Sequence, residues 1–465
     1  EIGYWTSMTE LSVASNRLHA LPIELGLLTI LSRLDMEHNT ISVPPAEVVA
    51  RGPADVVDFM RRICDSRFSG VLNLSGKALK VVNPEIFQIE GLRVLNMSDN
   101  QLTSLPDKFQ TMTMLTELAV ANNQLGTLPP SIANCESLQT LSINGNQMSS
   151  LPAVAGALPN LSHFEFEQAC ELLSPPRNII QRGRVPILEF LASIHDSQRT
   201  LGLKLVSMGL TTIPEEVLTL TGLRRLNLDK NILKSLPPNI GNLWSLEELT
   251  VTDNLITDLP PEIANLSALT ELDLKGNKIP VIPTALGQLS SLTILSLEND
   301  HVISPPKEII AAGTTVMVDY LRRLFESKIN GVLDLSHLSM WSLPEEIPEL
   351  RNLVEMSIAG NQIVHLPSSI GQLSSLAQLW MDQNQISALP PTIGMLVNVS
   401  SLALDFNQLA TLPNQFGDMV SLATLTISNN LLRVLPSSIG NLGNLRTLNV
   451  TNNVLRSLPQ SIGFL

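Results

Sequence analysis

The 465-residue sequence is poor in aromatic side chains, which make up 4% of it, and in charged side chains, which make up 15%. An ordinary soluble protein is ~25% charged. So few aromatic residues would fill several independent cores poorly, although the length alone would suit three domains of ~150 residues. Abundant leucine, asparagine, serine and proline favour instead one aliphatic motif that is used many times.

Basic side chains and long apolar runs are also scarce. The formal net charge is −14 and the isoelectric point is near 5.0. Nucleic acids and anionic membranes attract basic patches, so neither is an expected partner. No run of ~18 apolar residues occurs, so no transmembrane segment is expected.

Cysteine is rare as well. The three cysteines, Cys64, Cys135 and Cys170, are an odd number and lie far apart, which favours reduced thiols and a cytoplasmic, intracellular location. The sequence begins at Glu1 without a signal peptide and stops at Leu465 in mid-pattern, so we expect a fragment of a longer protein. Asn-x-Ser/Thr sequons argue weakly against this location, because the repeat itself generates them, at Asn73, Asn96, Asn160, Asn265, Asn398 and Asn449.

One short motif recurs along the chain and is clearest in LNMSDNQLTSLP at 95–106. Its asparagine recurs with a step of 23 inside each of four groups, at Asn16 and Asn39; Asn100, Asn123 and Asn146; Asn231, Asn254 and Asn277; and Asn361, Asn384, Asn407, Asn430 and Asn453. Degenerate copies have another residue there, namely Lys77, Cys170, Met208, Asp300 and Leu338. Together these predict about eighteen repeats.

Each repeat has the pattern of a short strand followed by a turn. Leu95 and Met97 alternate with polar residues, and such a strand buries its apolar face only by stacking on its neighbours. A side-chain amide such as that of Asn100 can satisfy the backbone groups of successive turns. Pro106 and its equivalents then fix the chain direction on the outer side. The pattern predicts an α/β solenoid with one parallel sheet.

The consensus LxxLxLxxNxLxxLPxxIxxLxx resembles the leucine-rich repeat family, and specifically its intracellular Ras-group subclass, which includes the plant intracellular Ras-group and Scribble/Erbin-like proteins. This resemblance implies a horseshoe with the sheet on the concave face, short helices or 3-10 turns on the convex face, and a protein partner on the concave face. Small GTPases and phosphatase subunits are partners of such arrays, so both are expected partner classes.

Three junctions interrupt the repeats, and at each the step lengthens from 23 to 38, as from Asn39 to Lys77. A doubled proline is followed by Gly52, Gly183 or Gly313 and then by a helical pattern of apolar residues. The expected organisation is the end of a repeat block at 1–46, a junction helix at 47–70, blocks of five at 71–176 and 203–306, junction helices at 177–202 and 307–331, and a block of at least six at 332–465, all in one continuous solenoid.

Two interpretations of the junctions remain open. In the favoured one, each junction is a long repeat whose longer convex helix covers its own core while the sheet runs through. In the other, each junction is a hinge or kink, because the repeats that follow the helices lack the asparagine of the ladder.

No catalytic or cofactor motif occurs: there is no P-loop, HExxH, CxxC pair, calcium loop or GxSxG. We therefore expect no enzyme activity in this segment, no cofactor and no metal. His38 and His337 are expected to be solvated, and Cys170 to be a ladder substitute rather than a reactive thiol.

The side chains that the strand pattern directs outward are mostly small or polar, and a few stand out. Trp380 lies at an outward strand position, where the repeat gives no core reason for an indole, and tryptophan is enriched at binding hot spots. Asp382 lies in the same repeat, Gln378 flanks Trp380, and Asp405 and Phe406 follow in the next repeat. We expect these five residues to contact a partner; the alternative is one aromatic ring packed on a neighbouring strand.

A second outward group is charged. It comprises Arg224, Arg225, Asp229, Lys230, Glu247, Glu248 and Asp273. Opposite charges on adjacent strands support one another modestly, so the alternative to a binding patch is a self-compensated polar face.

Three functions fit the sequence. The first is a non-catalytic scaffold that binds a protein on its concave face, in small-GTPase-linked signal transduction. The second is the sensor or docking region of a larger enzyme, such as a Roco-type GTPase, an adenylyl cyclase or a phosphatase. The third is a structural subunit of a large ciliary or organellar complex.

Overall fold

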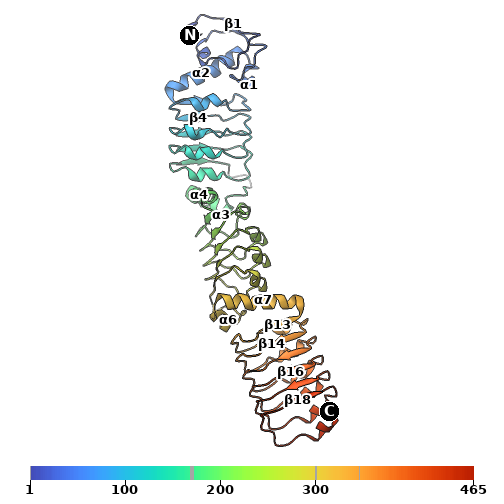
Figure 1. Cartoon of the computed structure of the whole chain (residues 1–465). Coiled ribbons are helices and arrows are strands. Elements are labelled where there is room, and N and C mark those ends of the chain that lie inside the picture. The colour runs from blue at the N-terminus through green and yellow to red at the C-terminus, as the bar shows by residue number, and fades with distance from the viewer. Residues whose placement is uncertain (1, 168–171, 299–300, 345) are drawn as a thin grey trace. The chain divides into compact units, whose positions relative to one another are not determined.

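The computed structural model describes residues 2–167, 172–298, 301–344 and 346–465, so Cys170 and Asp300 lie outside the described residues. Two compact units are present: unit 1 comprises Glu1–Leu210 with Pro214–Val217, and unit 2 comprises Thr211–Ile213 with Leu218–Leu465. Each unit is a solenoid of parallel strands, as the sequence predicts, and Figure 1 shows the strands stacked in chain order.

Unit 1 contains three-residue strands, short 3-10 turns and two junctions. Its strands are β1 (Glu10–Ser12), β2 (Arg33–Asp35), β3 (Val71–Asn73), β4 (Val94–Asn96), β5 (Glu117–Ala119), β6 (Thr140–Ser142), β7 (His163–Glu165) and β8 (Gly202–Lys204). Its α-helices are α1 (Ala46–Val49), α2 (Pro53–Ser69), α3 (Arg177–Ile180) and α4 (Arg184–Thr200). Its 3-10 helices are η1 (Ile2–Tyr4), η2 (Ile23–Leu27), η3 (Pro84–Gln88), η4 (Phe109–Thr111), η5 (Pro130–Asn134) and η6 (Ala153–Ala157).

Unit 2 repeats this plan around one junction. Its strands are β9 (Arg225–Asn227), β10 (Glu248–Thr250), β11 (Glu271–Asp273), β12 (Ile294–Ser296), β13 (Val332–Asp334), β14 (Glu355–Ser357), β15 (Gln378–Trp380), β16 (Ser401–Ala403), β17 (Thr424–Thr426) and β18 (Thr447–Asn449). The junction helices are α6 (Lys307–Ala311) and α7 (Thr314–Asn330). The 3-10 helices are η7 (Pro238–Asn242), η8 (Pro261–Asn265), η9 (Thr284–Gln288), η10 (Ile347–Glu349), η11 (Ser368–Gln372), η12 (Pro391–Met395), η13 (Asn414–Asp418), η14 (Ser437–Asn441) and η15 (Gln460–Phe464). The short helix α5 (Glu215–Leu218) lies where the two units meet in the sequence.

The core is a stack of aliphatic side chains closed by an asparagine ladder. Leu95 and Met97 are fully buried. Asn123 is typical of the ladder: its Nδ2 donates to the carbonyl oxygens of Val120 (3.1 Å) and Met97 (3.0 Å), and its Oδ1 accepts from the backbone N–H of Leu102 (3.0 Å). Each such side chain therefore joins two successive repeats and satisfies buried backbone groups on both.

The predicted junction helices are present as α2, α4 and α7, each 17 residues long. Each follows a glycine with a positive φ, which is +103° at Gly52, +91° at Gly183 and +96° at Gly313. A side chain would be strained there, which explains why glycine separates the helix from the preceding short one. The predicted apolar positions, such as Phe59 and Met60, form the buried faces of these helices.

The sheet does not run through the junctions, so this part of the favoured interpretation is wrong, whereas the junction helices do bury an apolar face as it expected. In unit 1, β1 pairs with β2 and strands β3 to β7 form one sheet, whereas no pairing among the described residues joins β2 to β3 or β7 to β8. In unit 2, β13 to β18 form a sheet that is likewise not paired with β12. One of the long junction helices occupies the chain between each unpaired pair of strands, and the parallel pairing stops there. The hinge hypothesis stays a prediction.

Lys77 shows how one degenerate repeat replaces its ladder asparagine. The lysine is 8% exposed, and its Nζ lies 2.8 Å from Asp58 Oδ2 and 3.5 Å from Asp55 Oδ1, both on α2. Burial alone would raise the pKa of Asp58, but hydrogen bonds donated by Lys77, Arg62 and Arg61 outweigh it and lower the pKa below its usual range. An ion pair thus ties the junction helix to the repeat that follows it.

Replacing Asp58 with asparagine should lower the free energy of unfolding of unit 1 by about 2 kcal/mol at pH 7, because the buried Lys77 charge loses its nearest partner. The depressed pKa of Asp58 gives stability above the ordinary carboxyl value, and this stability is lost as the pH falls below ~4. Denaturant unfolding from pH 7 to pH 3 should show the gap between variant and parent shrinking. The exposed Asp65→Asn change on the same helix is the control; a gap that does not depend on pH would contradict the ion-pair account.

Candidate protein-binding face

The sheet face is formed by the outward side chains of each strand. The two turn residues that precede each ladder asparagine also belong to it. In the C-terminal block, β13 to β18, the strands pair in register, so that outward side chains form columns across the sheet. Trp380 on β15 is aligned with Ser357 on β14 and with Ala403 on β16.

Trp380 is half-buried on this face, and its neighbours in the column are small. Neither Ser357 nor Ala403 has a side chain large enough to cover an indole. Gln378, two residues earlier on β15, lies on the same side of the sheet. Both interpretations of Trp380, a contact with a partner and an aromatic ring packed on a neighbouring strand, are compatible with this half-buried position.

Two carboxylates and a second aromatic ring lie next to this column, in the turns that follow β15 and β16. Asp382 and Asp405 are half-buried and occupy equivalent places in adjacent repeats. The Asp405 carboxylate accepts hydrogen bonds from the backbone N–H and the hydroxyl of Ser428, so the next repeat holds its orientation. Phe406 has a φ of +54° and is 55% exposed. The turn thus presents a bare phenyl ring beside a fixed carboxylate.

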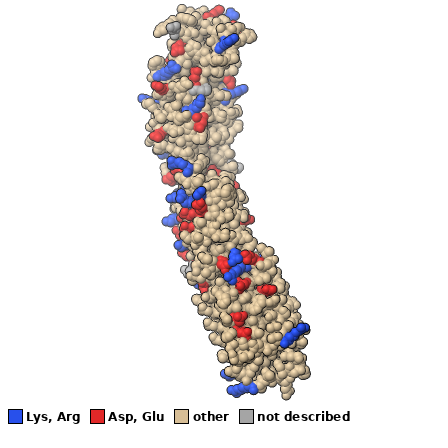
Figure 2. Space-filling view, in the orientation of Figure 1, with Lys and Arg blue, Asp and Glu red and all other residues tan. Residues whose placement is uncertain are grey.

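The charge on this face has one sign. Positions 332–337, 355–360, 378–383, 401–406 and 424–429 contain no lysine or arginine, whereas four carboxylates lie among them, at Asp334, Glu355, Asp382 and Asp405. The view of the C-terminal block in Figure 2 is mostly uncharged, with a few isolated charged side chains. A polar face with isolated carboxylates, one exposed phenyl ring and one half-buried indole results.

The predicted charged patch lies on β9 to β11 and the turns after them. Arg224 Nη1 lies 3.2 Å from Glu247 Oε1, and Arg225 is aligned with Glu248 across the β9–β10 pair. The Arg224–Glu247 ion pair and the alignment of Arg225 with Glu248 favour a self-compensated face, although Glu248 is also aligned with Glu271.

The turn residues of this patch are also engaged within the sheet. Asp229 Oδ1 accepts from the backbone N–H of Thr252 at 2.8 Å, and Asp273 Oδ2 lies 4.0 Å from Lys275 Nζ. Lys230 follows Asp229 with a φ of +56°. The patch therefore offers a partner fewer unsatisfied charges than its composition indicates.

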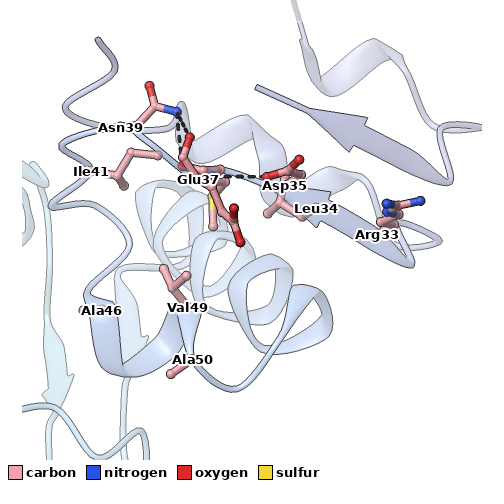
Figure 3. A pocket seen from close by; sticks show the side chains of 10 residues that line it. Arg33, Leu34, Asp35, Glu37, Asn39, Ile41, Ala46, Val49 and Ala50 are labelled. Atoms are coloured by element: carbon pink, nitrogen blue, oxygen red, sulfur yellow. Dashed lines mark hydrogen bonds between the residues drawn. The ribbon is translucent and has the colours of Figure 1, made fainter. Parts of the chain in front are cut away.

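A cleft beside β2 is a feature that the sequence analysis missed. It has a volume of about 650 Å³ and is lined by Arg33, Leu34, Asp35, Met36, Glu37, Asn39, Ile41, Ala46, Val49 and Ala50. Figure 3 shows the β2 residues on one side and Ala46, Val49 and Ala50 on the other. The repeat pattern gives no signal for it, because the cleft arises where the strand pairing stops.

The buried thiol of Cys135 and the grouping of titratable side chains bear on reactivity in the part of the chain that the structure describes. Burial raises the pKa of the Cys135 thiol to about 11, so it stays protonated and unreactive at neutral pH. Within the described ranges, no three His, Cys, Asp or Glu side chains come together to hold a metal ion. No helix within them has the length and apolar character needed to cross a membrane.

A family model described as leucine rich repeat matches residues 71–125 and 245–302. The chain contains leucine-rich repeats. These matched segments begin at β3 and just before β10, so they contain the strands and asparagines described above. No curated protein sequence matches the chain.

Solved structures of other leucine-rich-repeat proteins are similar to the chain. A leucine-rich-repeat protein of Leptospira interrogans is 26% identical, with 97% of this chain and 91% of that chain covered and a TM-score of 0.30. The plant peptide hormone receptor RGFR1 in complex with RGF2 is 23% identical, with coverages of 100% and 70% and a TM-score of 0.28. An internalin of Listeria monocytogenes is 19% identical, with both coverages 86% and a TM-score of 0.25.

Proposed function

We propose that the chain is a non-catalytic scaffold that binds a protein partner on the sheet face of its C-terminal block. Leucine-rich repeats generally mediate protein–protein interaction, and stacked repeats offer extended surfaces on which a partner can make many contacts. The sheet face of β13 to β18 is such a surface, and its rigid backbone positions the outward side chains without further ordering.

The observation that carries this proposal is the pair of aromatic side chains on this face, the half-buried Trp380 and the 55% exposed Phe406. Tryptophan contributes a large apolar area and one N–H donor, and it dominates binding energy where a partner covers it. The residues aligned with Trp380 on the neighbouring strands, Ser357 and Ala403, have small side chains. Phe406, Asp405 and Asp382 would form the rim of the contact.

The partner class follows from the resemblance to Ras-group arrays, and small GTPases or phosphatase subunits are the candidates to test first. A GTPase partner would bind in a nucleotide-dependent way. Recovery from cell extract with GTP-analogue or GDP loading therefore separates a signalling scaffold from a structural subunit, which would be recovered with one assembly in either state.

Changing both Trp380 and Phe406 to alanine should weaken partner binding by about 30-fold or more, which is the loss of a hot spot of ~2 kcal/mol. The measurement is quantitative pull-down of the partners that the parent chain recovers, followed by titration of the purified partner. Trp244→Ala is the matched control, because this indole is 58% exposed and lies after η7 rather than on a strand. Unchanged recovery with the double variant, or equal loss with the control, would refute the proposed face.

A further inference from the structure

Strand β2 has an open edge. In a parallel sheet, alternate residues direct their backbone N–H and C=O groups to opposite neighbours. Arg33 and Asp35 are bonded toward β1, so Leu34 and Met36 direct their backbone N–H groups to the other side. Among the described residues, no acceptor meets these two N–H groups. By contrast, the N–H of Leu74, which follows β3 and is equivalent to that of Met36, donates to the carbonyl of Asn96 at 2.7 Å.

The third junction closes the same edge with a side chain. The backbone N–H of Leu295, which is equivalent to Leu34, donates to the hydroxyl of Thr314 at 3.0 Å, and Thr314 is the first residue of α7. The first residue of α2, at the equivalent position, is Pro53, which has no hydroxyl. The first junction therefore lacks the group that covers the strand edge in the third.

The open edge faces the cleft of about 650 Å³ described above, which is a volume typical of ligand sites. Leu34 and Met36 are only half-buried, whereas the equivalent Leu95 and Met97 inside the next sheet are fully buried. Val49 lines the cleft opposite the strand. Unmet backbone donors and exposed core side chains thus lie together in one cavity of unit 1.

We propose that this cleft binds an extended peptide segment of a partner protein, which adds to β2 as a parallel strand in the place that β3 does not take. Exposed strand edges accept peptides in this way, with affinity from the backbone hydrogen bonds and specificity from alternate side chains. Alternate residues of the segment would lie beside Leu34 and Met36 and are therefore apolar. The outward residues would lie beside Asp35 and Glu37, where a basic side chain would bind more tightly than the neutral asparagine and serine that the chain's own strand β4 has at these positions.

The site is distinct from the sheet face of the C-terminal block, so either proposal can fail alone. The probe is a labelled heptapeptide, Leu-Arg-Val-Leu-Asn-Met-Ser, which copies residues 92–98 and includes the strand that pairs with β3. Binding to the full-length chain is followed by fluorescence anisotropy. Hydrogen exchange should show slower exchange at Leu34 and Met36 when the peptide is bound.

Two variants of the first junction should weaken peptide binding at least about tenfold. Pro53→Thr supplies the hydroxyl that closes the edge in the third junction, and Ala46→Trp fills the cleft from an exposed position on α1. Lys307→Trp is the matched control, because Lys307 occupies the position of Ala46 in the third junction. Trp380→Ala should also leave peptide binding unchanged, which separates this site from the sheet face.

N-methylation of the peptide tests the backbone pairing itself. In the β3–β4 pair, the peptide's valine and asparagine correspond to the residues bonded to the preceding strand, and its second leucine and methionine to those facing away. Methylation of the first pair of N–H groups should abolish binding, and methylation of the second pair should preserve it. No binding, equal effects of the two methylations, or full binding by Ala46→Trp would overturn the proposal.

Discussion

Replacing Gly287 with alanine is expected to destabilise unit 2 by about 3 kcal/mol or more. A Cβ at this position would lie 2.1 Å from the backbone nitrogen of Arg322 and 2.5 Å from its Cα, inside α7. Helix backbone cannot move aside as a flexible side chain can, so the helix must shift or the 3-10 turn must distort. The same close approach occurs at Gly26 and Gly156, where the nearest backbone atoms are 2.1 Å and 2.0 Å away.

Denaturant unfolding of the full chain measures this effect as a shift in the transition of unit 2. Gly222→Ala is the control, since a Cβ there has nothing within 4 Å and φ is not positive. It should be neutral or stabilising by up to ~1 kcal/mol, because alanine restricts the unfolded chain. Equal stability of the two variants would show that α7 packs equally well against a side chain at position 287.

Removing one ladder side chain, in Asn384→Ala, should cost about 3 kcal/mol. Asn384 Oδ1 accepts from the backbone N–H of Ile363 at 3.0 Å, and Nδ2 donates to the carbonyls of Ile358 (2.9 Å) and Met381 (3.2 Å). The variant leaves one buried donor and two buried acceptors with fewer partners, and each unmet buried group costs ~1–3 kcal/mol.

The neighbouring Gln385→Ala change controls for this substitution, because Gln385 is exposed and next to the ladder position. It should change the free energy of unfolding by less than ~0.5 kcal/mol. Thermal and denaturant unfolding of both variants would give the comparison. A ladder variant as stable as the control would mean that water replaces the amide at no cost.

The regular part of the fold could be predicted because each repeat position has one physical task. Leu95 and Met97 fill the core and Asn100 bonds the turns, so the constant spacing of the motif predicts the strand, the turn and the parallel stacking. The junction helices could also be predicted from the sequence, because their apolar positions follow the helical period.

The breaks in the sheet could not be predicted in this way. Whether β2 pairs with β3 depends on where α2 lies between them. No local sequence pattern predicts the position of this helix. The same holds for Lys77, whose partner Asp58 lies 19 residues earlier on the junction helix. These contacts depend on how the junction helix packs against the repeats. The degenerate ladder positions indicate only that another side chain takes the place of the asparagine.

The candidate site could likewise be predicted only in part. The period of two along β15 predicts that Trp380 points outward from the sheet. The small residues beside it and the hydrogen bonds from Ser428 to Asp405 become visible only with the strand register. Register likewise shows that Glu248 is aligned with Arg225 on one side and with Glu271 on the other, which the sequence alone does not show.

Site-specific photo-crosslinking tests the central claim, that a protein partner binds the sheet face of the C-terminal block. A benzophenone amino acid would replace Ser401, which is aligned with Gln378 on the adjacent strand, or Trp244 outside the sheet face, in otherwise unchanged full-length chains. The account predicts that position 401 yields one covalent partner, identifiable by mass spectrometry, and that Trp380→Ala abolishes the product. Crosslinks from position 244 alone, or a product that survives Trp380→Ala, would contradict it.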